Sequence, residues 1–228
     1  ISYKQMNEEW EKEYHEANHY DKNLHKAENK VIIEYICHIL RKDQEDASKN
    51  PLSIYGLEAD REIPLPIEGV GVIRIGGTID RLDLIGEGST QKMRVIDYKS
   101  GVYKDDTHKK KMSATWEELM TDENKGYVRQ TMMYSYAVEQ SLKSQELKVE
   151  PHLYFCSTNI LSDKMNTSIE LEGETISDFA KLSDTFKEQL TAKAKELLTT
   201  TDFPQCEENE CPSFCEFFKL CNRKPNEF

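Results

Sequence analysis

Residues 94–101, "RVIDYKSG", begin as an apolar strand and end with side chains that could do chemistry. Side chains alternate between the two faces of a strand, so Asp97 and Lys99 are expected on one face and Tyr98 on the other. A second carboxylate, Asp80, lies upstream in "GGTIDRLD". If these two strands pair across the intervening turn "GEGSTQ", Asp80 comes close to Asp97 at one edge of the sheet.

Two carboxylates beside one ammonium group favour a divalent metal site. Mg²⁺ is typically held by one or two carboxylates together with waters and substrate phosphates. The ammonium of Lys99 could orient or deprotonate a water, or neutralise charge that develops on a phosphate. The simpler alternative is a surface ion pair between Asp97 and Lys99, which would contribute little. Asp80 shifts the balance toward a site, as does a downstream helix that carries Gln130 and Tyr134 on one face.

The order of the expected elements defines the fold class. Hydrophobic periodicity predicts helical structure in residues 1–50, strands over 52–100 and a polar loop over 102–125. A helix over "GYVRQTMMYSYAVEQSL", strands in "PHLYFCST" and "TSIELEG", and a helix over 174–199 follow. The prediction is an α/β fold with a central mixed β-sheet flanked by helices, not a doubly wound parallel sheet.

The three motifs resemble, in order, those of the RecB-like branch of the PD-(D/E)XK nucleases. "GGTIDRLD", "VIDYKSG" and "GYVRQTMMYSY" are similar to G-x-I-D-R-x-D, D-Y-K-[ST]-G and Q-x-x-x-Y, and the resemblance spans about residues 30–225. It implies a restriction-endonuclease-like core in which Asp80, Asp97 and the main-chain carbonyl of Tyr98 bind Mg²⁺ or Mn²⁺. Lys99 would act on the water, and Gln130 and Tyr134 would shape the DNA side. An ordinary helix face is the alternative for this last pair.

One family feature has no counterpart in the chain. The resembled branch places a His in a small-residue context on a helix before the first acidic strand, and no such context surrounds the upstream histidines, which are His15, His19, His25 and His38. Glu58 is a weaker stand-in and more typical of a structural residue. The chain also lacks an initiator Met, so we expect it to be a fragment whose motif His lies in an upstream part.

The C-terminal segment is rich in cysteine. Cys206, Cys211, Cys215 and Cys221 are separated by short loops, as in thiolate-ligated metal or cluster sites. In the resembled AddB-type nucleases, three C-terminal cysteines and one distant cysteine bind a four-iron four-sulfur cluster. Zn²⁺ and free thiols in a degenerate remnant are the alternatives. Cys37 and Cys156 fit plain core thiols.

Net charge limits the ways in which the chain could contact DNA. The formal net charge is −12, which disfavours a module that simply coats nucleic acid. The basic run Lys109, Lys110 and Lys111 is the best candidate for a phosphate contact, with a solvated loop as the alternative. The absence of an apolar run or signal peptide predicts a cytoplasmic protein without a membrane segment.

The sequence therefore predicts a metal-dependent DNA nuclease domain of a RecB/AddB-like recombination-repair protein, acting with a helicase subunit or a fused helicase-like region. Residues 1–50 would form a helical lead-in, 51–200 the nuclease core and 201–228 the Cys-rich tail. The rival interpretation is a catalytically incomplete DNA-end-binding or scaffolding module that keeps the nuclease fold.

Overall fold

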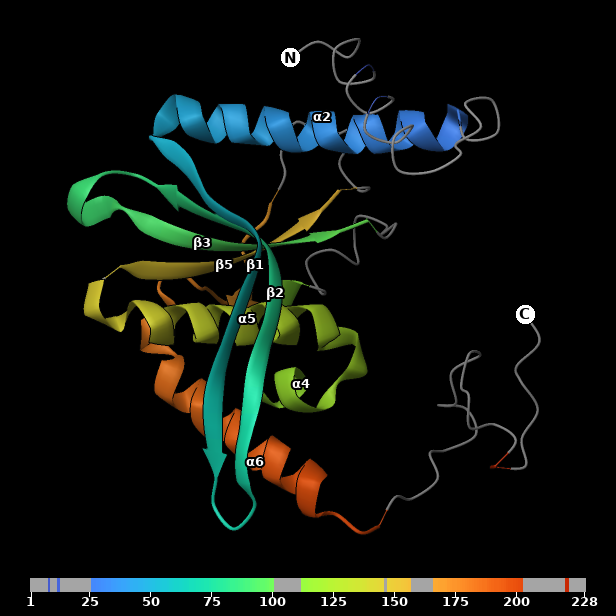
Figure 1. Cartoon of the computed structure of the whole chain (residues 1–228), viewed down its shortest axis with the longest axis vertical. Coiled ribbons are helices and arrows are strands. Elements are labelled where there is room, and N and C mark those ends of the chain that lie inside the picture. The colour runs from blue at the N-terminus through green and yellow to red at the C-terminus, as the bar shows by residue number, and fades with distance from the viewer. Residues whose placement is uncertain are drawn as a thin grey trace.

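The structure is a computed structural model that describes residues 8, 12, 26–100, 112–145, 147–156, 166–202 and 220–221, with only the backbone described at 26–29 and 144. A four-stranded mixed sheet lies at its centre, between helices on both faces (Figure 1). The predicted fold class is confirmed.

The central sheet has the order β1-β2-β3-β5. Its strands are β1 (Leu52–Ile67), β2 (Gly71–Ile85), β3 (Lys92–Lys99) and β5 (Lys148–Phe155). β1, β2 and β3 form an antiparallel meander, and β5 pairs parallel to β3. The predicted pairing of the two acidic strands across "GEGSTQ" is therefore confirmed, with a short 3₁₀ turn at Gly88–Thr90 between them.

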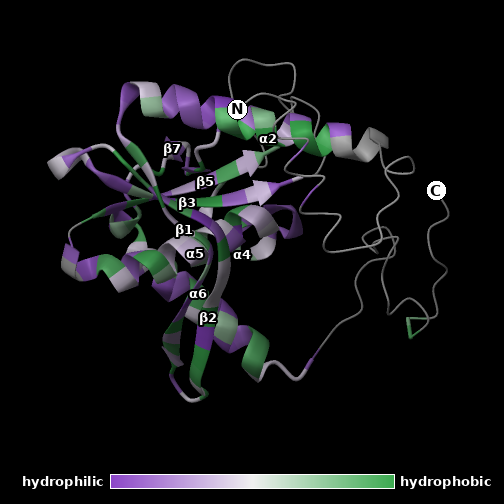
Figure 2. Cartoon of the chain, turned by 45° about the horizontal axis from the view of Figure 1, so that its top comes forward, coloured by the Kyte–Doolittle hydropathy of each residue, from purple (hydrophilic) through white to green (hydrophobic). Residues whose placement is uncertain are grey.

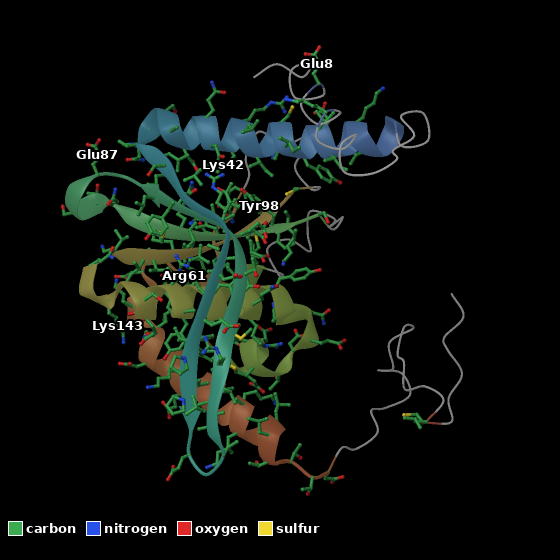
Figure 3. All side chains as sticks on the ribbon, in the orientation of Figure 1. Glu8, Lys42, Arg61, Glu87, Tyr98 and Lys143 are labelled. Carbon is green, nitrogen blue, oxygen red and sulfur yellow. The ribbon has the colours of Figure 1, made fainter. Side chains whose placement is uncertain are left out.

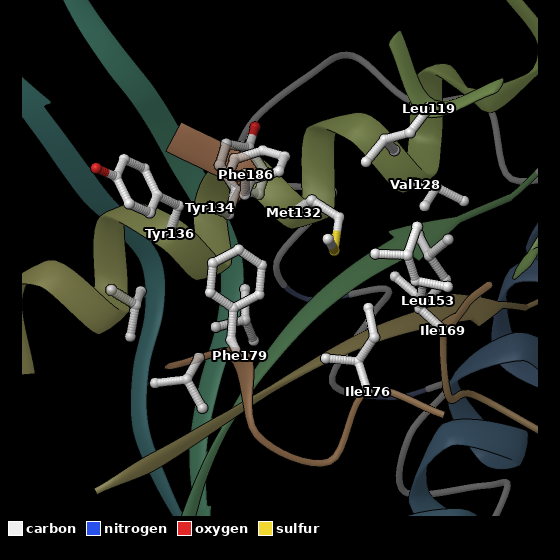
Figure 4. Close-up of a cluster of buried hydrophobic side chains, with 14 of the residues drawn as sticks. Leu119, Val128, Met132, Tyr134, Tyr136, Leu153, Ile169, Ile176, Phe179 and Phe186 are labelled. Atoms are coloured by element: carbon white, nitrogen blue, oxygen red, sulfur yellow. The ribbon is translucent and has the colours of Figure 1, made fainter. Parts of the chain in front are cut away.

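Parallel pairing of β3 with β5 requires a crossover, and helix α5 (Gly126–Leu142) provides it. Helix α5 covers one face of the sheet, and α6 (Ser183–Thr199) packs on the same side, against both α5 and β1 (Figure 1). Tyr136 of α5 packs among Phe179 and Phe186, with ring centroids 5.5–6.4 Å apart. Figure 4 shows how Met132, Leu153 and Ile176 extend this cluster toward the sheet. The core thus lies on the side of the sheet that α5 covers.

Helix α2 (Lys26–Lys49) covers the opposite face (Figure 1). Ion pairs join it to the sheet, and hydrophilic residues are interspersed with hydrophobic ones along this helix (Figure 2). Asp43 accepts a 2.6 Å bond from Arg81, and Asp46 accepts one of the same length from Arg94. Asp83, fully buried, lies between the two guanidinium groups and pairs with both. Such buried charges are tolerated because each of them is paired.

Two regions differ from the sequence-based expectation. The predicted loop over 102–125 contains helix α4 (Trp116–Thr121), which begins with a capping box formed by Thr115 and Glu118. It also contains strand β4 (Ser113–Ala114), which pairs with β6 (Glu170–Leu171), and β6 pairs in turn with β7 (Glu174–Thr175). Residues 101–111 lie outside the described part.

The predicted start of the last helix at 174 was wrong. The chain passes from β7 through a short 3₁₀ turn (Phe179–Lys181), and α6 begins only at Ser183. Ile176 and Phe179 are buried as expected, but they reach the core from outside the helix. Their three-residue spacing fits a helical stripe and a 3₁₀ turn equally well, so periodicity alone could not separate the two.

No helix in the described ranges has both the length and the apolar character that crossing a membrane would need.

Candidate active site

The candidate site forms where β3 ends. Colours in Figure 2 change from hydrophobic along the middle of β3 toward hydrophilic at its C-terminal end. Asp97 and Lys99 point to the α5 face, where Lys99 Nζ lies 2.5 Å from Oδ2 of Asp97. Tyr98 points to the α2 face, where its hydroxyl accepts a 3.3 Å hydrogen bond from Arg81 (Figure 3). The alternation predicted from the sequence is confirmed.

Asp80 of β2 joins this strand end directly. The ladder between β2 and β3 ends at the pair Arg81 and Ile96, so Asp80 and Asp97 are the next residues along their strands. The Asp80 side chain reaches across, and its Oδ2 accepts a 2.7 Å hydrogen bond from the main-chain N–H of Tyr98. The structure thus brings the two acidic strand ends together.

Helix α5 completes the arrangement from the opposite side. Lys99 Nζ donates a 3.1 Å hydrogen bond to Oε1 of Gln130, and Nε2 of Gln130 donates a 2.8 Å bond to the hydroxyl of Tyr134. Gln130 and Tyr134 lie four residues apart on one helix face, as the sequence predicted. A continuous chain of polar contacts therefore runs from Asp97 through Lys99 to α5.

Two glycines of "GGTIDRLD" allow close packing around β2, one of them beside this chain of contacts. Gly77 has a φ of +150°, and a Cβ placed on it would lie 3.3 Å from Cε1 of Tyr134. Gly76 has a φ of +131°, and its Cβ would meet the carbonyl oxygen of Arg61 at 1.9 Å. Gly76 therefore allows close pairing of β1 with β2, whereas Gly77 allows the Tyr134 ring to lie against β2.

The electrostatics of the strand end favour a bound cation. Burial raises the pKa of Asp97, Lys99 opposes that rise, and the negative charge of Asp80 adds to it. Asp97 thus pairs with Lys99 while the like charge of Asp80 acts on it, an arrangement that a divalent cation would relieve. Nearby, burial raises the pKa of the Cys156 thiol to about 11. Cys156 is therefore protonated at neutral pH and is a poor metal ligand.

The donor set fits a hard cation with few protein ligands. Within the ranges that the structure describes, no group of three or more His, Cys, Asp or Glu side chains could hold a metal ion. Asp80 and Asp97 supply two carboxylates, which matches the one or two that Mg²⁺ sites typically use. The remaining protein ligand would be a main-chain oxygen, for which the carbonyl of Tyr98 is the predicted donor.

Tyr127 is a neighbour of the site that the sequence reasoning missed. Its ring centroid lies 4.7 Å from Lys99 Nζ, within the range of a cation–π contact. Its side chain is 40% exposed and lies beside Phe155, with ring centroids 6.3 Å apart. The available signal was its position three residues before Gln130, which places both residues on the same side of a helix.

Several residues named from the sequence, among them histidines to which no role was assigned, lie outside the described part of the chain. These are Lys109, Lys110, Lys111, Cys206, Cys211, Cys215, His15, His19 and His25. Cys221 is described and partly buried, and Cys156 is buried. His38 lies on α2, where burial lowers its pKa, and Glu58 is exposed in β1. The expected roles of the cysteine tail and the basic run stay predictions.

Comparison with known families agrees with this geometry. The family model described as the PD-(D/E)XK nuclease superfamily matches residues 2–222, which is nearly the whole chain. No curated protein matches the chain. Strand β3 carries an acidic residue and a Lys two positions apart, and β2 carries a further acidic residue beside them, as the family name describes. The chain belongs to the PD-(D/E)XK nuclease superfamily.

Proposed function

We propose that this protein is a metal-dependent deoxyribonuclease that hydrolyses phosphodiester bonds at the C-terminal end of β3. The observation that carries the proposal is the contact chain Asp97–Lys99–Gln130, with Asp80 bonded to the main chain beside it. Family membership supports nuclease chemistry independently of these contacts.

In the proposed site, Asp80, Asp97 and the carbonyl of Tyr98 hold Mg²⁺ or Mn²⁺. When bound, such an ion polarises the phosphoryl oxygen, lowers the pKa of a bound water and stabilises the leaving oxygen. The ammonium group of Lys99 lies beside Asp97, one of the proposed metal ligands. In this proposal it orients the water or neutralises charge on the phosphate. Gln130 holds the Lys99 ammonium from the α5 side, and Tyr134 holds Gln130.

We also propose that the protein belongs to the RecB/AddB-type branch and processes DNA ends together with a helicase subunit or region. The order of the three motifs supports this assignment. In the same proposal Cys206, Cys211, Cys215 and Cys221 bind a four-iron four-sulfur cluster or Zn²⁺ and fasten the C-terminal segment to the core. Iron or zinc analysis of protein purified without oxygen tests the cysteine site, and finding neither metal would exclude it.

The rival is a DNA-end-binding module that keeps the fold without catalysis. The fact that favours it is the absence of the family's upstream His context from this sequence. The contacts around Lys99 argue against a loss of catalytic function. A module that only binds DNA would have no need to hold an ammonium between a carboxylate and a helix amide.

A nuclease assay on the whole chain separates the two functions. Labelled linear duplex and single-stranded DNA are incubated with Mg²⁺, Mn²⁺ or EDTA, for the natural protein, Lys99→Met and the control Lys148→Met. Lys148 is an exposed Lys at the start of β5, far along the sheet from Lys99. We expect cleavage by the natural protein and Lys148→Met, and at least about 100-fold less by Lys99→Met. DNA binding without cleavage in either metal would support the rival.

A further inference from the structure

A polar cavity of 440 Å³ opens on the α2 face of the sheet, at the end opposite the candidate active site. It lies where β3 begins at Lys92, whereas the active site lies where β3 ends at Lys99, roughly 20–25 Å away at 3.3 Å per residue. Figure 3 shows Lys42, one of its lining residues, beneath α2 on the side facing the sheet. The cavity therefore belongs to neither the acidic strand ends nor α5.

The charged lining of the cavity has three cationic and two anionic side chains. Lys42, Lys92 and Arg94 face the cavity together with two carboxylates, Asp46 and Glu150. Lys42 pairs with Asp46, and Lys92 donates a 2.6 Å bond to Glu150. An ammonium has three N–H donors, so each Lys retains two that no described residue uses. In a chain of net charge −12, this local excess of donors favours an anionic ligand.

His152 is a second, independent indication of a ligand. It is only 8% exposed and lines the cavity. Its Nδ1 lies 2.9 Å from the hydroxyl of Thr167, but its Nε2 has no hydrogen-bond partner among the described residues and lies 3.8 Å from Glu150. A buried polar atom without a partner costs about 1–3 kcal/mol, which a bound polar group would relieve.

The other lining groups define the ligand class. Burial lowers the pKa of His152, so its imidazole is neutral at pH 7 and can bond to an uncharged polar group. Asn50, Asn166 and Ser168 add amide and hydroxyl groups to the lining. Small-molecule sites usually measure about 300–1,000 Å³. A ligand of this site must therefore be small, anionic at one end and rich in hydrogen-bonding groups elsewhere.

We propose that this cavity binds a small phosphomonoester of the size of a nucleoside monophosphate. The phosphate would contact Lys42 and Lys92, and the polar remainder would contact Nε2 of His152 and the side chains of Asn166 and Ser168. Recognition here uses none of the residues placed in the nuclease site, so the inference stands or falls independently of the proposed nuclease activity.

Titrations of the whole chain in EDTA test this site without nuclease chemistry. The probes are dAMP, deoxyadenosine, inorganic phosphate and sulfate, with affinity from calorimetry and the His152 ring nitrogens followed by NMR. The His152 signal is assigned with His152→Gln. The test variants are Lys42→Met, Lys92→Met and Ser168→Ala, and the last keeps both ion pairs intact. The control is Lys49→Met, an exposed Lys that pairs with Glu45 on the same helix outside the cavity.

We expect dAMP to move the His152 ring signals and to bind at least tenfold more tightly than deoxyadenosine. Lys42→Met and Lys92→Met should each weaken dAMP binding about tenfold or more, while Lys49→Met leaves it unchanged. If either Lys variant fails to fold, weaker dAMP binding by folded Ser168→Ala supports the site and unchanged binding contradicts it. Three results would overturn the proposal. The first is equal affinity for dAMP and deoxyadenosine, and the second is an affinity for inorganic phosphate or sulfate equal to that for dAMP. The third is a His152 signal that dAMP does not move.

Discussion

The main-chain N–H of Tyr98 donates a 2.7 Å hydrogen bond to Oδ2 of Asp80, directly beyond the last paired residues of β2 and β3. This bond holds one carboxylate beside another, although like charges repel each other. The strand ends are thus built to keep Asp80 and Asp97 together before any cation arrives, which is the preorganisation that a metal site needs.

Substitutions of Asp97 and Lys99 should have different effects on metal binding and on activity. Asp97→Asn should lose both Mn²⁺ affinity and DNA cleavage, because the carboxylate is a proposed ligand. Lys99→Met should keep Mn²⁺ affinity within a few-fold and lose at least about 100-fold in activity, because an ammonium is not a ligand. Calorimetry with Mn²⁺ and the nuclease assay measure the two quantities. Unchanged Mn²⁺ affinity in Asp97→Asn would remove Asp97 from the site.

Gln130 should affect the rate of DNA cleavage by positioning the ammonium group of Lys99. Gln130→Leu removes the acceptor that holds Nζ of Lys99, so we expect kcat to fall about 10–100-fold with little change in KM. Gln130→Glu keeps an acceptor oxygen and should restore part of the rate. Tyr134→Phe removes only the next contact in the chain and should cost less than Gln130→Leu. An effect of Gln130→Leu on KM alone would instead point to DNA binding.

Two glycines of β2 offer a matched test of steric space. Gly71 and Gly76 have nearly the same φ, +134° and +131°, but a Cβ meets nothing within 4 Å at Gly71 and backbone at 1.9 Å at Gly76. Gly71→Ala should lower the free energy of unfolding by about 1–3 kcal/mol through backbone strain. Gly76→Ala should lower it further or prevent folding, because β1 must move away. Urea denaturation measures both, and equal losses would contradict the close approach.

The pH dependence of stability should reveal Asp46. Burial would raise the pKa of this carboxyl, but hydrogen bonds from Lys42 and Arg94 outweigh burial and hold the pKa below its ordinary value of 3.8. The unfolded chain then binds the proton more readily, so the stabilisation is complete above that value and is lost as pH falls through the lowered pKa.

Asp46→Asn should therefore lower the free energy of unfolding by about 1–3 kcal/mol at pH 7. The difference in the free energy of unfolding between the natural protein and the variant should stay constant down to about pH 5 and become smaller below about pH 4. Urea denaturation across this range measures this difference. Glu68→Gln, at an exposed position in the turn between β1 and β2, is the control and should change the free energy little. A difference that grows toward acid would contradict the assigned sign.

Much of the site was predictable because it depends on short-range rules. Strand alternation predicted that Asp97 and Lys99 share one face. The turn at "GEGSTQ" predicted that β2 pairs with β3 and brings Asp80 beside Asp97. Helix periodicity placed Gln130 and Tyr134 together. These inferences need only the geometry of one strand, one hairpin and one helix.

The remainder depended on contacts between segments distant in sequence. Arg81, Asp83 and Arg94 look like surface charges in the sequence, and only the packing of α2 shows that they are buried and paired. Helix α4 could have been found from Thr115 and Glu118, which have the capping-box spacing, but polar composition suggested a loop. Ile176 and Phe179 satisfied a helical spacing without belonging to α6.

The ion pairs between α2 and the sheet have a consequence for motion. Asp43 and Asp46 lie three residues apart on one helix face, and their partners Arg81 and Arg94 lie on neighbouring strands. A slide of α2 by one turn, about 5.4 Å, would break both bonds at once and leave Asp83 as the one remaining carboxylate for two buried guanidinium groups, at a cost of several kcal/mol. Small displacements along the helix axis are therefore unfavourable at every step. Helix α2 should leave the sheet as a single unit, so its central amides and those of β3 should exchange their hydrogens in one shared opening event.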